Sequence, residues 1–153
     1  MTTITFTLPV QPRTKKTSNR IVRMGKNKER IRILPSEEYE QFALECMFFR
    51  GKLHREIDFP LPITGPVAVK ALFYRSGDYG DALGYEQALA DILQDEKWSK
   101  AKNGKAPKKI RDGLGIILDD KQIRWWDGSR LLIGEPRVEV EITILGESQE
   151  RLI

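Results

Sequence analysis

Strict alternation of apolar and polar residues is the clearest pattern in this chain, and it predicts three strands that each bury one face. Threonine alternates with apolar residues from Thr3 to Leu8, and apolar residues occupy every second position from Pro66 to Tyr74. The most regular alternation runs from Arg137 to Ile144. Ile116 to Leu118 is a continuous apolar run, which we interpret as a fourth strand that is short and buried.

Helical spacing of apolar residues predicts two main helices. The first begins near Ser36, a candidate N-cap, and ends at the candidate terminator Gly51. The second extends from about Leu83 to Gln94, and its polar face carries Gln87 and Asp91, which are neighbours because they are four residues apart. Strands and helices in this order indicate an α+β domain built on a small mixed sheet.

A length of 153 residues, of which 40% are hydrophobic, suits one domain with its own core, so we assign residues 1–153 to a single domain. The lone cysteine, Cys46, has no partner for an internal disulfide, and no secretory signal precedes the first strand. We therefore expect a cytosolic protein. We expect no membrane partner, because no apolar run approaches the roughly 18 residues that span a bilayer.

Two segments carry almost only basic charge, although the net charge of the chain is just +4. Residues 13–32 contain nine basic residues and one acid, and we interpret them as a basic hairpin that turns near Gly25. We interpret residues 97–114 as a flexible basic loop. Blocks of one sign are either solvated faces or interaction surfaces, and here they favour nucleic-acid phosphates as the partner. The candidate contacts are Arg13, Lys15, Lys16, Arg20, Lys100, Lys102, Lys105, Lys108, Lys109 and Arg130.

The tryptophans fall into two groups. Trp98 lies inside the second basic segment, where it is a candidate to stack on a base or to wedge a junction. Trp125 and Trp126 stand beside the C-terminal strands, and we expect them in the core.

Acidic residues at the junctions of the predicted elements are the candidate chemistry. Asp78 and Asp81 lie just before the second helix, and Asp119-Asp120 directly follows the apolar run at 116–118. Aspartates at such places often only form turns or cap helices. Carboxylates that converge from separate strand ends can instead hold Mg²⁺, which prefers oxygen ligands and phosphate partners. We therefore take Asp81, Asp119 and Asp120 as candidate catalytic residues and metal ligands, for Mg²⁺ or Mn²⁺ as its substitute.

No other residue pattern competes with this interpretation. Cys46 falls on the apolar face of a helix, and His54 has no catalytic partner at a suggestive spacing. The sequence has neither a GxxxxGK[ST] phosphate-binding loop nor a Cys/His cluster for zinc. Metal-activated water needs no nucleophilic side chain, so the sequence predicts metal-dependent phosphodiester hydrolysis.

The segment from Asp81 to Leu93 fits the pattern D-x-x-[NG]-[LY]-x-x-A-x-x-D-x-L, and Asp119-Asp120 follows it after a short apolar run. In these motifs the chain resembles the RusA-type Holliday-junction resolvases of phages and prophages. Four further segments are similar to a phage branch of that family: residues 12–16, 34–36, 127–130 and 136–139.

The resemblance implies a homodimeric, Mg²⁺-dependent endonuclease that cuts four-way DNA junctions symmetrically, in recombination or repair, within a bacterial or phage-infected cell. Two symmetrical cuts require two equivalent sites, which a two-fold dimer supplies. The resemblance also implies that Asp81 and Asp120 are metal ligands, with Asp119 adjacent.

The chain departs from the better-known family members at two positions. Leu83 stands where they have a second aspartate, and Gln87 stands where they have a lysine. Either Asp78, Glu86 or Asp91 completes the metal site, or the metal keeps more water. The alternative function is a branched-DNA-binding protein of the same fold that does not cut, and an RNA-directed nuclease is a third hypothesis.

Overall fold

A mixed five-stranded sheet forms the base of the molecule in the computed structural model, which describes residues 2–14, 20–25, 30–34, 37–77 and 82–146. Its strands are β1 (Thr3–Leu8), β4 (Val67–Arg75), β7 (Ile123–Trp126), β8 (Arg130–Ile133) and β9 (Arg137–Ile144). β9 pairs antiparallel with both β1 and β4. β7 and β8 run parallel to β4 and follow one another along its other edge.

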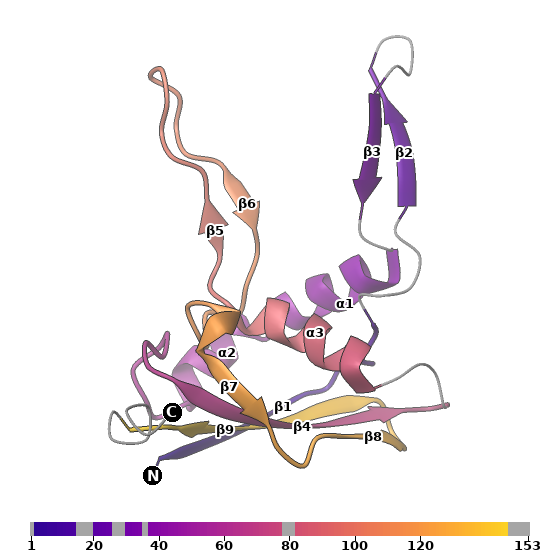
Figure 1. The fold of residues 1–153 in the computed structure, drawn as a ribbon, viewed down its shortest axis with the longest axis vertical. Helices are drawn as coiled ribbons and strands as arrows, with labels where there is room; N and C mark the ends of the chain where they lie inside the picture. Colours follow the sequence, from indigo (N-terminus) through magenta and orange to yellow (C-terminus); the bar gives the residue numbers. More distant parts are fainter. Residues whose placement is uncertain (1, 15–19, 26–29, 35–36, 78–81, 147–153) are drawn as a thin grey trace.

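Helices α1 (Glu37–Met47), α2 (Arg50–Glu56) and α3 (Ala82–Leu93) lie on one face of this sheet, as Figure 1 shows. The alternating residues of β1, β4 and β9 point into the core, as their pattern predicts. α3 buries its apolar stripe against them, and the rings of Phe73 and Tyr85 meet with centroids 5.6 Å apart. The predicted α+β class is therefore confirmed.

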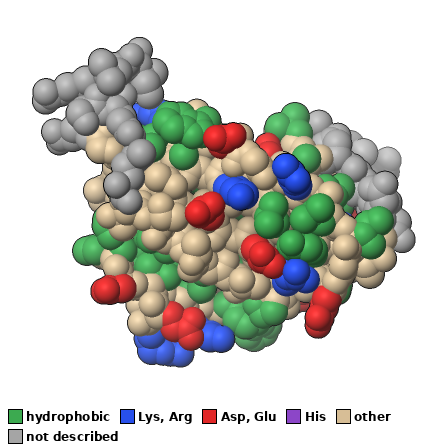
Figure 2. All heavy atoms as spheres, turned by 90° about the horizontal axis from the view of Figure 1, so that it is seen from below, with side chains coloured by type: hydrophobic (Ala, Val, Ile, Leu, Met, Phe, Trp, Pro, Cys, Tyr) green, Lys and Arg blue, Asp and Glu red, His purple; other side chains and the backbone are tan. Residues whose placement is uncertain are grey.

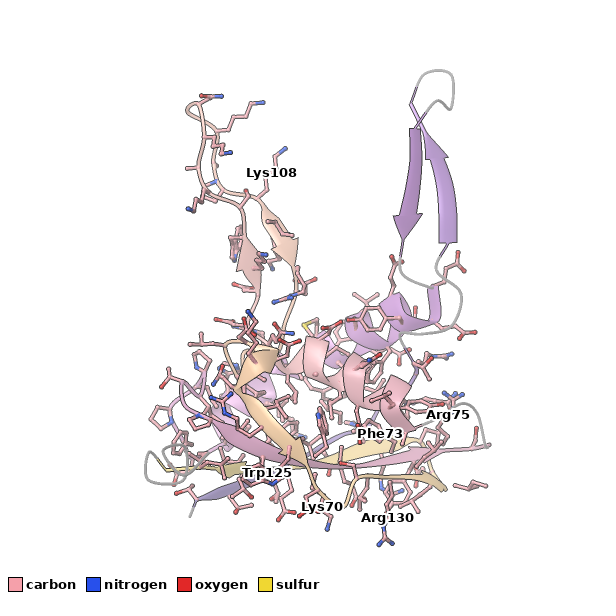
Figure 3. All side chains as sticks on the ribbon, viewed as in Figure 1. Lys70, Phe73, Arg75, Lys108, Trp125 and Arg130 are labelled. Atoms are coloured by element: carbon pink, nitrogen blue, oxygen red, sulfur yellow. The ribbon has the colours of Figure 1, made fainter. Side chains whose placement is uncertain are left out.

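The opposite face of the sheet has no helical cover among the described residues. Figure 2 shows hydrophobic side chains on that face mixed with both basic and acidic ones. Lys70 and Arg130 point away from the helices there (Figure 3). Trp125 lies beside Lys70 and is 42% exposed, so the prediction that it belongs to the core is wrong; Trp126 is partly buried against the core.

Two hairpins project from the helix side of the molecule (Figure 1). The first pairs β2 (Arg20–Met24) with β3 (Arg30–Leu34), which confirms the predicted basic hairpin, although its turn at 26–29 lies outside the described residues. The second pairs β5 (Lys97–Trp98) with β6 (Lys109–Arg111), and we call residues 97–111 the β5–β6 arm.

The β5–β6 arm corrects the prediction of a flexible loop over 97–114. At its tip Lys105 N donates to Lys102 O at 2.9 Å, and Asn103 and Gly104 have φ of 53° and 74°. Positive φ at both central residues is the geometry of a two-residue hairpin turn, for which Asn-Gly is the strongest sequence signal. The Asn103-Gly104 pair was visible in the sequence. The short strands were not predicted, because the segment around this pair is rich in lysine and contains Pro107.

The predictions for the helices and for the strand at 116–118 also need correction. The structure has three α-helices within its described part, and Gly51 lies inside α2 where a terminator was predicted. Ile116 and Ile117 are fully buried, yet the predicted strand at 116–118 is reduced to isolated bridges of Ile117. The proposed cap Ser36 lies outside the described residues. No helix in the described ranges has the length and apolar character needed to cross a membrane.

Candidate metal site and nucleic-acid surface

A pocket of about 370 Å³ opens between α3 and the short 3₁₀ helix η1 (Asp120–Gln122). Its lining residues are Gln87, Ala90 and Asp91 from α3 and Asp120 from η1. Gln87 and Asp91 share a helix face, as their spacing predicts. The fold thus brings two carboxylates that are distant in the sequence into one pocket.

Asp120 sits at the exposed rim of this pocket, and its carboxyl has a raised pKa. Partial burial is the largest cause, followed by a hydrogen bond with Asp119 and by the negative charges of Asp119 and Asp91. The negative charges beside Asp120 disfavour its ionised form unless a cation lies between them. Asp91 and Asp120 therefore form a place where a divalent cation would be stabilised.

Asp119 is the N-cap of η1. Its Oδ1 accepts a hydrogen bond from Lys121 N at 2.9 Å, which is the largest cause of the lowered pKa of this carboxyl. This is the capping role that aspartates at such junctions often have. Asp119 fixes the turn that presents Asp120 to the pocket.

Gln122, which was not among the predicted site residues, completes that turn. Its Oε1 accepts hydrogen bonds from Leu118 N and Asp119 N, both at 2.8 Å. Its Nε2 donates to Ile63 O at 2.7 Å and to Gly65 O at 2.9 Å, which ties η1 to the chain before β4. The spacing of Asp119 and Gln122 is that of a capping box, so a sequence signal existed.

Asp91 is oriented by two side chains that were not among the predicted site residues. Gln94 Nε2 donates to Asp91 Oδ1 at 3.4 Å, and Tyr39 from α1 forms a side-chain hydrogen bond with Asp91. Burial, followed by the charge of Asp91, raises the pKa of Tyr39, so its hydroxyl stays protonated. Gln94 is buried and accepts from Arg111 NH2 at 3.2 Å. The base of the β5–β6 arm is therefore connected to the pocket.

The remaining predicted acids divide into two groups. Asp78 and Asp81 lie outside the described residues. Glu86, whose pKa is raised by burial, is not among the residues that line the pocket. Across the described ranges no group of three or more acidic, histidine or cysteine side chains forms a metal cluster. His54 binds the carbonyl of Leu114 at 2.7 Å, a contact that gives it a role in packing.

The predicted nucleic-acid contacts are also distributed unevenly. Lys100, Lys102, Lys105 and Lys108 gather on the β5–β6 arm, where they line one groove. Lys109 instead pairs with Glu96 at 3.4 Å and with Asp112 at 3.1 Å. Arg130 points away from the helix side, and thus away from both hairpins (Figure 3). Arg13 is half-buried, Lys15 and Lys16 lie outside the described residues, and so does the side chain of Arg20.

The donor set of the pocket fits a hard divalent cation. Two carboxylates and the amide of Gln87 offer oxygen ligands, and Mg²⁺ is commonly held by one or two carboxylates while it keeps several waters. A larger set of protein ligands is not required. Asp91 and Asp120 are accordingly the described residues that would hold the metal.

We expect divalent binding to stabilise the protein in a pH-dependent way. A raised pKa means that folded Asp120 takes up a proton more readily than the unfolded chain, so without metal its contribution to stability increases as the pH falls through the folded pKa. Added Mg²⁺ or Mn²⁺ should raise the Tm at neutral pH, and this increment should shrink as protons compete for Asp120. Thermal denaturation with metal titrations at several pH values measures this increase in Tm. An increase that does not depend on pH would contradict the assignment of Asp120 as a metal ligand.

Comparison of the sequence with known proteins finds no matching family model and no matching curated protein. The functional assignment consequently depends on the pocket, on the two hairpins and on the sequence motifs.

Proposed function

We propose that this chain is a metal-dependent endonuclease that acts on branched DNA, as a resolvase of the RusA type. The observation that carries the proposal is the meeting of Asp91 and Asp120 in one pocket of the helix layer. α3, which supplies Asp91, lies between the bases of the two hairpins (Figure 1). A carboxylate pocket flanked by cationic projections suits a polyanion whose backbone is to be hydrolysed.

In this proposal Asp120 and Asp91 hold the cation, and Asp81, which precedes α3 in the sequence, supplies a further ligand. When bound there, a divalent cation would supply the Lewis-acid chemistry that phosphodiester hydrolysis needs. Gln94 and Tyr39 keep the Asp91 carboxylate in one orientation. The Gln87 amide also lines the pocket, and in this proposal it donates a hydrogen bond to a phosphate oxygen.

Both hairpins contribute the binding energy for the DNA backbone. The strands of the first contain Arg20, Arg23, Arg30 and Arg32, and the β5–β6 arm contains seven basic residues. Phosphate contacts of this kind release counterions, so the affinity is expected to fall steeply with salt. We further propose that two copies form a two-fold dimer, since symmetrical incision of a four-way junction requires two equivalent sites. Light scattering of the purified protein tests the dimer.

The decisive experiment is incision of a synthetic four-way junction beside a duplex of the same sequence. Nicks at the branch with Mg²⁺, none with EDTA and none on the duplex are the expected results. Junction binding without incision under Mg²⁺ or Mn²⁺ would support the second candidate, a non-catalytic branched-DNA-binding protein. Leu83 favours that candidate, because its exposed apolar side chain cannot ligate a metal at a position where the family has aspartate. Preferential cleavage of RNA in a substrate competition would point to an RNA-directed nuclease.

A further inference from the structure

The β5–β6 arm bears a groove of its own, separate from the carboxylate pocket. The groove has a volume of about 530 Å³, and no carboxylate is among its lining residues. Figure 3 shows Lys108 projecting from the arm, far above the sheet. Five lysines line the groove together with aromatic, aliphatic and small side chains: Lys97, Lys100, Lys102, Lys105, Lys108, Trp98, Ile110, Ala106 and Ser99.

Two large apolar side chains of the groove are exposed to solvent. Trp98 is 50% exposed and Ile110 is 60% exposed, because both belong to a hairpin that extends away from the core. Trp98 Nε1 donates to Glu96 Oε1 at 3.1 Å, and Lys109 Nζ lies 5.5 Å from the centre of the indole ring. These contacts hold the ring in place while half of its surface remains open. The arm thus presents a preorganised apolar platform.

The charges of the arm separate into two faces. Lys109 and Arg111 are held at its base, Lys109 by Glu96 and Asp112 and Arg111 by Gln94 and the carbonyl of Asp95. Ile110, which lies between them in β6, and Lys108, which directly precedes β6, line the groove. Among the residues that the structure describes, none of the five groove lysines forms an ion pair. Their mutual repulsion is relieved when an anion enters.

Hydrogen bonds connect the two strands of the arm beyond the β5–β6 pairing. Ser99 N donates to Lys108 O at 2.8 Å, and Lys108 N donates to Ser99 Oγ at 2.9 Å. The Asn103-Gly104 turn closes its tip. A fixed aromatic face beside closely spaced cations is the arrangement used to bind single-stranded nucleic acid, where bases stack and phosphates meet lysine.

We propose that this groove binds unpaired nucleotides, with a base stacked on Trp98 and Ile110 and the flanking phosphates on the groove lysines. Lysines alone would suffice for the phosphates of a paired duplex, whose base faces are hidden within the stack. The exposed platform of Trp98 and Ile110 adds binding energy only if the face of a base is accessible for stacking. Base faces are accessible where strands exchange at a branch. This inference rests on the proposed function for the identity of the natural ligand. In it, the arm recognises the branch and the carboxylate pocket hydrolyses the backbone.

The test measures binding by the full-length protein in EDTA, so that cleavage plays no part. The probes are a fluorescein-labelled single-stranded oligothymidine, a blunt duplex, and a four-way junction with 2-aminopurine at the branch. Trp98→Ala should weaken single-strand binding roughly 5- to 150-fold, the equivalent of about 1–3 kcal/mol of stacking per base. When the wild-type protein binds the junction, the fluorescence of the 2-aminopurine should change, and Trp98→Ala should abolish this change. The affinity of the variant for the duplex should change little. Trp98→Phe should retain most of the binding, because it keeps an aromatic face.

Trp125→Ala is the matched control, since Trp125 is similarly exposed but lies on the uncovered face of the sheet. It should leave all three affinities unchanged. Equal losses for single strand and duplex in Trp98→Ala, with an unchanged circular dichroism spectrum, would overturn the proposal, as would no loss at all. The result is independent of catalysis: a protein that never incises a junction can still bind unpaired DNA through Trp98, and an active nuclease can lack this preference.

Discussion

Asp120→Asn is expected to lower the rate of junction incision by roughly 10³-fold or more, because it removes a charged ligand from a site that stabilises several kcal/mol of transition-state charge. Asparagine has nearly the same shape, so junction binding in EDTA should remain within about two-fold of wild type, where 0.4 kcal/mol corresponds to two-fold. The substitution also relieves the repulsion from Asp91 and Asp119. The metal-free variant should therefore melt at a higher temperature than wild type near neutral pH.

Asp119→Asn is the neighbouring control. Asparagine is also a good N-cap, so this variant should keep the η1 turn and most of the activity. Single-turnover incision with increasing Mg²⁺, together with the Tm increment from metal, separates the two variants. Equal loss of activity in both would show that the carboxylate pair acts as a unit. Full activity in Asp120→Asn would remove this residue from the site.

Gly113→Ala is expected to destabilise the fold by about 3 kcal/mol, near the upper end of what overpacking costs. A Cβ at this position would lie 2.0 Å from Gln94 O and 2.8 Å from the carbonyl carbon of Asp95. Both atoms belong to the backbone, so neither can rotate away. The clash also falls at the residue whose side chain connects the arm to Asp91, so metal binding should weaken together with stability.

A melting temperature lower by roughly 6–12 °C is the expected readout of Gly113→Ala, at about 2–4 °C per kcal/mol for a domain of this size. Gly65→Ala is the matched control, because a Cβ there meets no heavy atom within 4 Å. Its effect should stay within about 1 kcal/mol. If the two alanine variants melt at the same temperature, the close approach at Gly113 is not a constraint on the fold.

The helix–sheet core was predictable from local pattern. The alternation in β1, β4 and β9 places every second side chain inside, and the helical stripe of α3 from Tyr85 to Leu93 is buried as expected. The basic hairpin formed by β2 and β3 also follows from short apolar strands on either side of a glycine turn. These features depend on periodicity, which residues close in sequence determine by themselves.

The candidate site was predictable only in part. Asp120 was predicted as a site residue because it follows an apolar run, and in the structure it lines the pocket. Asp119, which looked equivalent to it in the sequence, instead caps η1. The side chains of adjacent residues point in different directions. Only the backbone conformation of the turn decides which of the two aspartates faces the pocket. Asp91 was one of several alternatives until the packing of η1 beside α3 brought it close to Asp120.

The sequence by itself determined the α+β class, the three strands β1, β4 and β9 of the sheet, the charge of the two projecting segments and the short set of acids to consider. The tertiary structure decided which carboxylates share a pocket, that Gln94 and Arg111 join it to the β5–β6 arm, and that this arm is a hairpin with an open tryptophan. The physical reason is the range of the interactions. Periodicity and turn chemistry act over a few residues, whereas the contacts of Asp91, Gln94 and Trp98 depend on how distant segments pack.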